Sequence, residues 1–166
     1  MMKPMAAQSQ KPKGGQGPSI VNKKAYHNFE LVEKYEAGLE LRGSEVKSLR
    51  AAAADLSGSY ARIEDSECWL VGAKIAAYQQ AGNAGHDPAR KRKLLLHRVQ
   101  LHRIQVKLDQ RGYTLVPLRL YFNQKGLAKI ELALAHGKRQ YDKRRAITER
   151  AQKRDIDRSM KKYRSR

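Results

Sequence analysis

Apolar and polar residues alternate along much of the chain from residue 27 onward, and this alternation predicts mainly β-structure. Segment His27–Tyr35 reads as a strand with one polar side, and Glu36–Leu41 continues it. Gly38 lies inside this strand, where a glycine often marks a bulge or a barrel corner. We therefore expect one long strand with a bulge or a barrel corner near Gly38.

Two later regions predict hairpins. Residues 59–72 form two alternating segments around the turn-like pair Asp65-Ser66, and residues 113–134 form two more around a turn at 123–126. Pro117 lies in the first strand of the second hairpin, which predicts an edge or bulged position because proline cannot donate a ladder hydrogen bond.

Helical spacing is predicted in two places. Ser44 is a good N-cap residue, and the apolar residues behind it predict a short helix over residues 44–51. Asp87-Pro88 begins a second helical stretch that ends at Arg111. Its apolar side would be formed by Leu94, Leu95, Val99, Leu101 and Val106. Five or six short strands and two helices without βαβ alternation favour a small antiparallel β-barrel with helical additions.

Charge divides the chain into three regions. Residues 1–24 carry five lysines and no acid, residues 25–136 carry 17 Lys/Arg against 12 Asp/Glu, and residues 137–166 carry 13 against four. Residues 1–19 mix Pro, Gly, Gln, Ser and Lys without periodicity, which predicts a disordered basic leader. Residues 20–136 are long enough for one domain without metal or disulfide. Residues 137–166 have too few apolar side chains to fold alone, so we expect a basic tail that is disordered until it is bound.

A net charge of +19 predicts a polyanionic partner, and RNA fits better than a membrane. No apolar run approaches the ~18 residues that a spanning helix needs, and the N-terminus lacks the apolar region of a secretory signal. The one cysteine, Cys68, can form neither an internal disulfide nor a zinc site, and we expect it to be buried. These features indicate a cytoplasmic protein, taken as a monomer by default.

The cluster Arg90–Lys93 stands where the second helix was predicted to begin, although cations there oppose the helix dipole. A phosphate-binding cluster explains this placement, while a solvated charged face is the structural alternative. Glu36 has a similar pair of interpretations: a surface ion pair, or a carboxylate that accepts from an RNA amino group or 2′-hydroxyl. Tyr60, Trp69 and Tyr121 are interpreted as packing residues rather than as base-stacking platforms.

Little in the sequence indicates an enzyme. It has no glycine-rich phosphate loop between a strand and a helix, its five histidines lack metal-ligand spacing, and its acids are scattered. We therefore expect no cofactor and no metal. In the tail, Ile156, Met160 and Tyr163 fall at helical spacing, which is compatible with a helix that forms on RNA or with a permanently disordered arm.

Several motifs in a fixed order resemble the small protein B family, the SsrA-binding proteins of bacteria. The resemblance runs from about Asn22 to the C-terminus. Its motifs are Asn22-Lys23-Lys24-Ala25, Glu36-Ala37-Gly38-Leu39, Gly43-Ser44-Glu45-Val46-Lys47-Ser48-Leu49-Arg50, Ser59-Tyr60-Ala61, His86-Asp87-Pro88 with Arg92-Lys93-Leu94-Leu95-Leu96, and Gly137-Lys138-Arg139 followed by Tyr141-Asp142-Lys143-Arg144.

The resemblance implies an oligonucleotide-binding (OB) type β-barrel that catalyses nothing. Such proteins bind the tRNA-like domain of transfer-messenger RNA and deliver it, with elongation factor Tu, to stalled ribosomes for trans-translation. The family's RNA-binding acid, leucine and lysine fall on Glu36, Leu95 and, across an alignment gap, Lys129. With the basic motifs, the expected RNA-binding set is Asn22, Lys23, Lys24, Glu36, Lys47, Arg50, Arg92, Lys93, Leu95 and Lys129.

The resemblance also implies a role for the tail. In the family the tail enters the empty message channel of the small subunit near the decoding centre and becomes helical. The corresponding residues here are Gly137, Lys138, Arg139, Tyr141, Asp142, Lys143, Arg144, Ile156 and Met160. Tyr141 stands where some members carry histidine, a change that keeps stacking but not protonation. Two alternatives remain: a generic ribosome-associated RNA-binding protein or RNA chaperone, and an RNA-processing enzyme.

Overall fold

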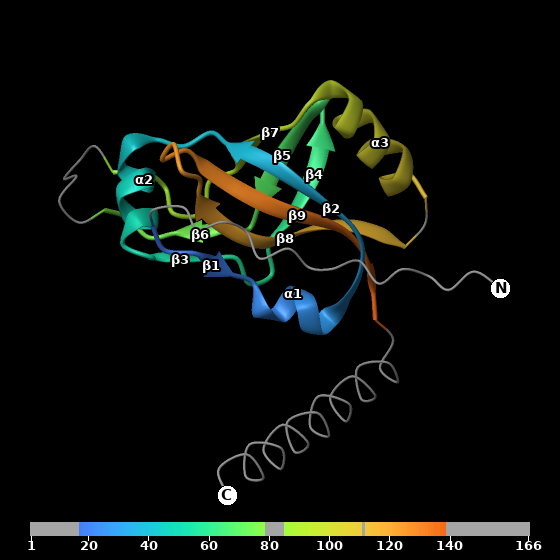
Figure 1. The fold of residues 1–166 in the computed structure, drawn as a ribbon, viewed down its shortest axis with the longest axis horizontal. Coiled ribbons are helices and arrows are strands. Elements are labelled where there is room, and N and C mark those ends of the chain that lie inside the picture. The colour runs from blue at the N-terminus through green and yellow to red at the C-terminus, as the bar shows by residue number, and fades with distance from the viewer. Residues whose placement is uncertain (1–16, 79–84, 111, 139–166) are drawn as a thin grey trace, which may run out of the picture.

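The computed structural model describes residues 17–78, 85–110 and 112–138. Figure 1 shows a closed sheet with helices at its ends and edges. The strands are β1 (Ile20–Val21), β2 (Phe29–Leu39), β3 (Ala54–Asp55), β4 (Tyr60–Glu64), β5 (Glu67–Val71), β6 (Lys74–Ile75), β7 (Arg92–Leu95), β8 (Tyr113–Phe122) and β9 (Ala128–Gly137). The helices are α1 (Lys23–Asn28), α2 (Gly43–Arg50) and α3 (Arg98–Leu108).

The main sheet closes on itself. Its strands follow the order β1-β8-β4-β5-β7-β2-β9, and β8 also pairs with β9, so six antiparallel strands form a ring to which β1 is added. The interior is filled by apolar side chains from every strand of the ring, including Leu70, Leu94, Leu115, Ile130 and Leu132, all at most 2% exposed. This architecture confirms the predicted mainly β fold with a small closed antiparallel sheet.

Helix α1 covers part of the outer face of the sheet. A second apolar cluster joins Ala25 of α1 to Val116 and Leu118 of β8 and to Ala133 and Ala135 of β9. The sequence interpretation missed this helix, because it assigned His27 and Asn28 to the following strand. Six residues are too few to show a clear helical period, so the helix depends on this packing.

Both predicted hairpins are confirmed. β4 and β5 pair from Tyr60↔Val71 to Glu64↔Glu67, and the turn residues Asp65 and Ser66 have φ angles of 50° and 60°. Two consecutive positive φ angles are typical of the tight turns whose twist matches the flanking strands. β8 and β9 pair along their full lengths, with a register shift directly after Pro117, as its side chain predicts.

Gly38 does not mark a bulge, one of the two features expected there, because the register shift in β2 lies between Leu31 and Glu33. Gly38 instead pairs regularly with Leu95 on one side and Lys129 on the other. A Cβ at this position would lie 3.2 Å from the Cβ of Leu95, closer than nearly all such contacts. The glycine therefore permits a close side-chain approach.

The predicted helix from Asp87 to Arg111 is also only partly right. Its first part is strand β7, which pairs with β5 and β2, and helix α3 begins at Arg98. The run of leucines at 94–96 is compatible with a helix or with a buried strand. It forms a strand because it pairs with two strands that are distant in sequence. In α3, Val99 and Val106 are 64% and 48% exposed, so the predicted apolar side was rotated away from the real one at Ile104.

Candidate nucleic-acid interface

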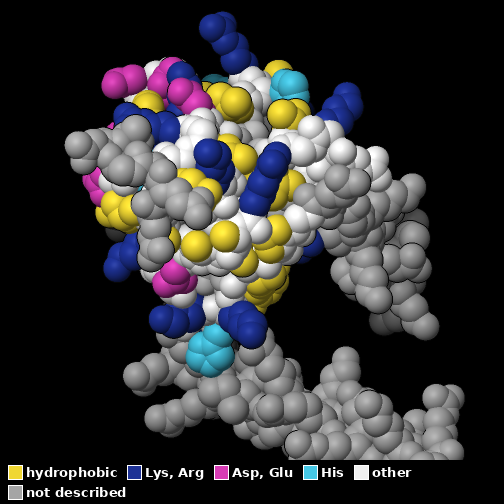
Figure 2. Space-filling model, turned by 90° about the vertical axis from the view of Figure 1, so that its left-hand side faces the viewer, with side chains coloured by type: hydrophobic (Ala, Val, Ile, Leu, Met, Phe, Trp, Pro, Cys, Tyr) yellow, Lys and Arg dark blue, Asp and Glu magenta, His cyan; other side chains and the backbone are white. Residues whose placement is uncertain are grey.

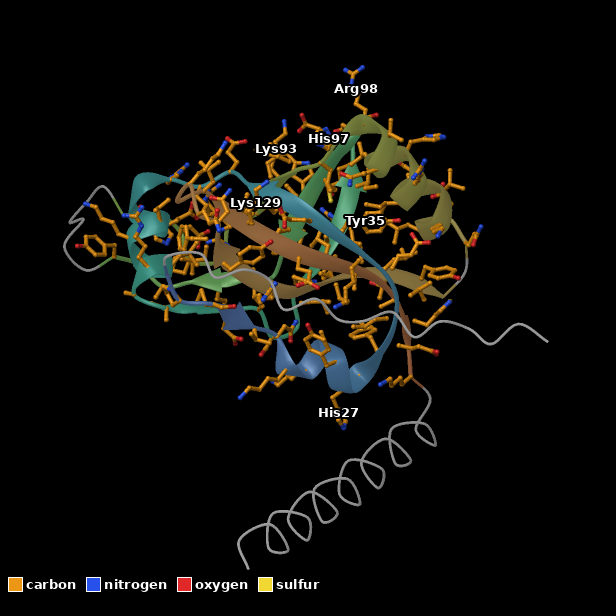
Figure 3. All side chains as sticks on the ribbon, in the orientation of Figure 1. His27, Tyr35, Lys93, His97, Arg98 and Lys129 are labelled. Atoms are coloured by element: carbon orange, nitrogen blue, oxygen red, sulfur yellow. The ribbon has the colours of Figure 1, made fainter. Side chains whose placement is uncertain are left out.

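Four strands place a row of side chains on one outer face of the closed sheet. Cross-strand pairing aligns Leu95 of β7 with Gly38 of β2, Gly38 with Lys129 of β9, and Lys129 with Tyr121 of β8. Directly paired residues point to the same side of a sheet, so the four positions form one continuous row. Figure 3 labels Lys129 in this part of the sheet and also Lys93, which comes from β7.

Glu36 stands beside this row, two residues before Gly38 on the same side of β2. Its carboxylate accepts a hydrogen bond from the Tyr121 hydroxyl, and the Nζ of Lys129 lies 3.6 Å from its Oε1. Burial and the hydrogen bond to Glu36 together raise the pKa of Tyr121 to about 12. The hydroxyl therefore stays protonated at neutral pH and remains a donor to Glu36.

A second row runs parallel to the first. Glu36 pairs with Glu131 of β9, and Glu131 pairs with Arg119 of β8. Glu131 is neutralised from both sides, by Lys34 at 3.0 Å and Arg119 at 3.1 Å. The Arg119 guanidinium also lies 4.6 Å from the centre of the Tyr121 ring, a cation–π contact that fixes the tyrosine. The two rows together form what we call the Glu36 face: Glu36, Gly38, Leu95, Arg119, Tyr121, Lys129 and Glu131.

The structure thus brings together Glu36, Leu95 and Lys129, which the sequence placed on three separate motifs. Leu95 is 54% exposed, an unusual position for a leucine beside a charged cluster. Sequence reasoning missed Arg119 and Tyr121. The signal was present, because Leu120 and Phe122 are inward residues of β8 and alternate with Arg119 and Tyr121, which are left on the outer face.

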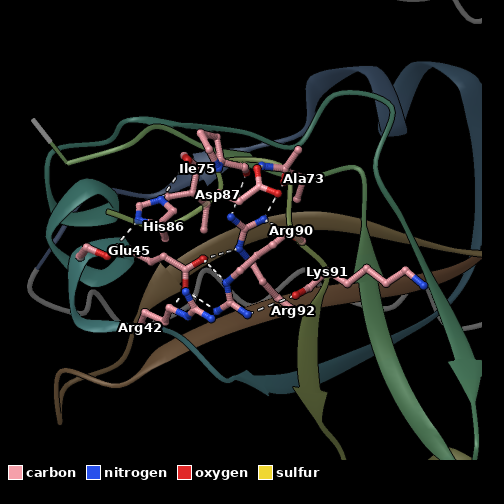
Figure 4. A network of polar contacts seen from close by, with 12 residues as sticks. Arg42, Glu45, Ala73, Ile75, His86, Asp87, Arg90, Lys91 and Arg92 are labelled. Atoms are coloured by element: carbon pink, nitrogen blue, oxygen red, sulfur yellow. Dashed lines mark hydrogen bonds and ion pairs between the residues drawn. The ribbon is translucent and has the colours of Figure 1, made fainter. Parts of the chain in front are cut away.

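Arg92, expected to bind phosphate, is buried and serves the fold. Its side chain is 0% exposed, and its Nε donates to Oε1 of Glu45 at 2.9 Å. Its remaining donors are directed at backbone carbonyls of Ala73 (2.7 Å), Arg90 (3.0 Å) and Pro88 (2.9 Å). A guanidinium with its donors used inside the protein cannot reach a phosphate, so this prediction is wrong. Figure 4 shows the network.

Glu45 is the centre of that network. Its Oε2 accepts from Arg90 Nη2 at 2.5 Å and from the backbone N–H of Arg42 at 2.7 Å. Burial alone would raise the pKa of Glu45, but the hydrogen bonds from Arg90, Arg42 and Arg92 outweigh it and hold the pKa below its ordinary value. The buried carboxylate is therefore ionised and paired, as a charge in a protein interior must be.

His86 connects the same helix to the small β3–β6 sheet. Its Nδ1 lies 2.9 Å from the Ser44 hydroxyl and its Nε2 lies 3.1 Å from the carbonyl of Ile75. The ring is 4% exposed. The motifs at 43–50 and 86–96 thus contribute framework residues (Ser44, Glu45, His86, Arg92) that hold α2 against β7.

Asn22 also proves to be a framework residue, contrary to the sequence-based expectation. Its Nδ2 donates to the carbonyls of Leu56 and Pro117, both at 3.0 Å, and its Oδ1 accepts from the N–H of Ala25 at 3.1 Å. It caps α1 and joins that helix to β8. Because Asn22 is 4% exposed and both hydrogens of its amide are donated inside the protein, it has no donor left for RNA.

The remaining basic candidates are accessible but lie on other elements. Lys23 and Lys24 are exposed on α1, and Lys47 and Arg50 on α2. Lys93, on β7, forms an ion pair with Glu67. Figure 2, viewed from the α2 side, shows Lys and Arg side chains distributed between apolar patches, with acids gathered mainly at one edge. Such a surface attracts phosphates over a broad area rather than at one point.

Only the start of the tail falls within the described residues. Gly137 ends β9 opposite Phe29, and the N–H of Lys138 donates to the carbonyl of Asn28 at 2.9 Å. The tail therefore leaves the domain beside the end of α1. Arg139, Tyr141, Asp142, Lys143, Arg144, Ile156 and Met160 lie outside the described residues, as do residues 1–16 of the leader.

Within the described ranges, no cluster of His, Cys, Asp and Glu is arranged to hold a metal ion. None of the helices described is both long and apolar enough to cross a membrane. Cys68 is buried, as expected, and burial raises the pKa of its thiol to about 12.

The small closed antiparallel sheet, with charged, aromatic and apolar side chains on one outer face, defines a mainly β protein. The chain belongs to the SmpB protein family, whose model matches residues 19–162. The SsrA-binding protein of Sulfurihydrogenibium sp. is 52% identical over 84% of this chain and 91% of its own length. That of Thermus thermophilus is 49% identical over 84% and 97%.

A solved structure gives the same assignment. One chain of the structure described as "tmRNA-SmpB: a journey to the center of the bacterial ribosome" is 49% identical to this chain. It superposes with a TM-score of 0.65, over 79% of this chain and 95% of that one.

Proposed function

We propose that this protein binds the tRNA-like domain of transfer-messenger RNA and carries it to stalled ribosomes for trans-translation. The observation that carries the proposal is the identity of about half of all residues to SsrA-binding proteins over nearly their full length. The likeness to an SmpB chain in a tmRNA and ribosome structure supports the same function. The protein acts as an RNA carrier and not as an enzyme.

The Glu36 face is the proposed RNA-binding site. Folded RNA is recognised by shape, by phosphate contacts and by bases that leave the helical stack. Lys129 and Lys93 supply cations on or beside this face, Leu95 supplies an apolar contact, and Glu36 supplies an acceptor. Lys23, Lys24, Lys47 and Arg50 are exposed cations at the periphery, which suits phosphate contacts without sequence reading.

The tail, residues 137–166, is the proposed ribosome-binding element. In this proposal it enters the empty message channel of the small subunit, near the decoding centre. Its 13 Lys/Arg suit an RNA-lined channel, and a message in that channel would exclude it. In this proposal the protein works in the cytoplasm as a monomer, and elongation factor Tu joins through the RNA.

The test is binding of the purified protein to the isolated tRNA-like domain against excess bulk tRNA at several salt concentrations. We expect tight binding that survives the competitor, because shape and base contacts are absent from non-specific complexes. Binding that collapses under competition would favour a generic RNA-binding protein or RNA chaperone. Cleavage of the bound RNA over hours would favour a processing enzyme.

A further inference from the structure

Glu36 is an acid at the centre of the proposed site on a strongly basic protein, and its carboxylate keeps acceptor capacity. The side chain is 57% exposed. Tyr121 donates to Oε2, and Lys129 approaches Oε1 only to 3.6 Å, beyond a normal hydrogen bond. An ionised carboxylate accepts about four hydrogen bonds, so each oxygen can accept at least one more.

An exposed apolar side chain stands near this carboxylate, because Leu95 is 54% exposed. Leu95 lies over Gly38, with its Cβ, Cδ1 and Cγ 3.2, 3.4 and 3.7 Å from where a Gly38 Cβ would be. Gly38 is two residues from Glu36 on the same side of β2. The face of a base can therefore pack on Leu95 while its edge reaches the carboxylate, which is how proteins bind bases that leave the RNA stack.

The four bases differ in what their Watson–Crick edges offer to a carboxylate. Guanine presents two adjacent donors, N1–H and N2–H₂, and can pair with both oxygens at once. Adenine and cytosine present one amino group next to a ring nitrogen that is an acceptor, and uracil places one N–H between two carbonyls. An acceptor facing a carboxylate repels it, so a bidentate carboxylate selects guanine.

We propose that the Glu36 face binds one unpaired guanine of the RNA, with Glu36 accepting from N1–H and N2–H₂ and Leu95 contacting the base. Tyr121 is a positioning residue: its hydroxyl holds Glu36 and its ring is fixed by Arg119 at 4.6 Å. Lys129, whose Nζ lies 3.6 Å from Oε1 of Glu36, adds positive charge beside the bound base. This inference rests on the proposed function, since it names what the same site recognises.

The experiment is analogue interference mapping on the tRNA-like domain. Guanosine is sparsely replaced by inosine phosphorothioate, which lacks the N2 amino group, and protein-bound and unbound RNA are compared after iodine cleavage. With the wild-type protein we expect interference at a particular guanosine. With Glu36→Gln that signal disappears and affinity falls roughly 5- to 150-fold, the range for a bidentate base contact. Guanosine phosphorothioate alone is the control.

Tyr121→Phe is the matched variant for positioning, because it keeps the ring beside Arg119 and removes only the O–H. We expect inosine interference at the same guanosine with reduced amplitude, and an affinity loss smaller than that of Glu36→Gln. A structural role alone would lower the free energy of unfolding without changing the interference pattern.

Two results would overturn the guanine site. One is interference that is the same in wild type and Glu36→Gln at every guanosine. The other is Glu36-dependent interference by 2′-deoxynucleotides without inosine interference, which would assign Glu36 to a 2′-hydroxyl. If the wild-type protein binds bulk tRNA equally well, the proposed function fails. The mapping is then done on that tRNA, where a guanosine whose inosine interference depends on Glu36 is still expected.

Discussion

The Nε of Arg92 donates a hydrogen bond to Oε1 of Glu45 over 2.9 Å, and neither side chain is exposed to solvent. The pair joins the first turn of α2 to the start of β7, and β7 ends at Leu95. Arg92, a basic residue inside a motif expected to bind RNA, thus supports the strand that carries Leu95, the side chain that faces the RNA in the proposed complex.

Arg92→Ala should destabilise the fold by about 3–5 kcal/mol, because it leaves the buried Glu45 carboxylate with one partner fewer. The measurement is the free energy of unfolding in urea. Lys93→Ala is the control. The Lys93 side chain is next to Arg92 in sequence, is 33% exposed and pairs with Glu67 on the surface, so we expect a loss of about 1 kcal/mol or less in the free energy of unfolding. Equal losses for the two variants would contradict the assignment of Arg92 to the framework.

Lys93→Ala should instead affect RNA binding. Removing one phosphate contact lowers the slope of log K against log salt concentration by about 0.7–0.9. The measurement is RNA affinity across a salt series. A double variant that also changes Arg92 should show no further decrease in slope, provided that it is assayed where it is folded. A decrease in slope equal to two phosphate contacts would restore the original interpretation, in which Arg92 and Lys93 both bind phosphate.

The stability that Glu45 contributes should depend on pH. Because the pKa of Glu45 in the folded protein is below the ordinary value of 4.5, its contribution is present in full above pH 4.5 and is lost as pH falls further towards the folded pKa. The difference in free energy of unfolding between wild type and Glu45→Gln should therefore be constant near neutrality and shrink in acid. Urea unfolding from pH 3 to 7 tests this, and a difference that grows in acid would exclude it.

Local signals in the sequence were sufficient for both hairpins. The β4–β5 turn at Asp65-Ser66 and the register shift at Pro117 follow from residue types that act within a few positions. β7 was mistaken for the start of a helix because its pairing partners, β5 and β2, are distant in sequence. No local pattern reports such a pairing.

The candidate site, too, depends on pairing between strands that are distant in sequence, which the sequence alone does not report. The family resemblance gave Glu36, Leu95 and Lys129, yet only the register of β7, β2 and β9 shows that they share one face. Asn22 and Arg92 were assigned to RNA on residue type, and residue type cannot report that a partner elsewhere in the chain has buried them. Tyr121 was interpreted as packing because an aromatic residue in a strand usually is.

Gly38→Ala tests the close approach of Leu95. The added Cβ would lie 3.2 Å from the Leu95 Cβ and displace that side chain, so RNA affinity should fall. In combination with Leu95→Ala the two losses should not add, because both remove the same contact. Gly43→Ala is the control, since nothing lies within 4 Å of its added Cβ. Additive losses of RNA affinity in the double-mutant cycle would show that Gly38 does not act through Leu95.

Deletion of residues 139–166 tests the separate role of the tail. Ending the chain after Lys138 keeps its N–H bond to the Asn28 carbonyl, and with it the contact between the end of β9 and α1. The shortened protein should retain its stability and its affinity for the free tRNA-like domain, because the Glu36 face is intact. Peptide tagging on stalled ribosomes should be lost, since no segment remains to enter the message channel.

A scrambled tail of identical composition separates charge from fit. It keeps 12 Lys/Arg and four Asp/Glu but breaks the spacing of Ile156, Met160 and Tyr163. If the tail must form a helix with one apolar stripe, tagging should fall although general attraction to RNA is unchanged. Full tagging by the scrambled protein would show that the tail acts only through its positive charge. Full tagging by the deletion variant would show that the tail has no role in ribosome recognition.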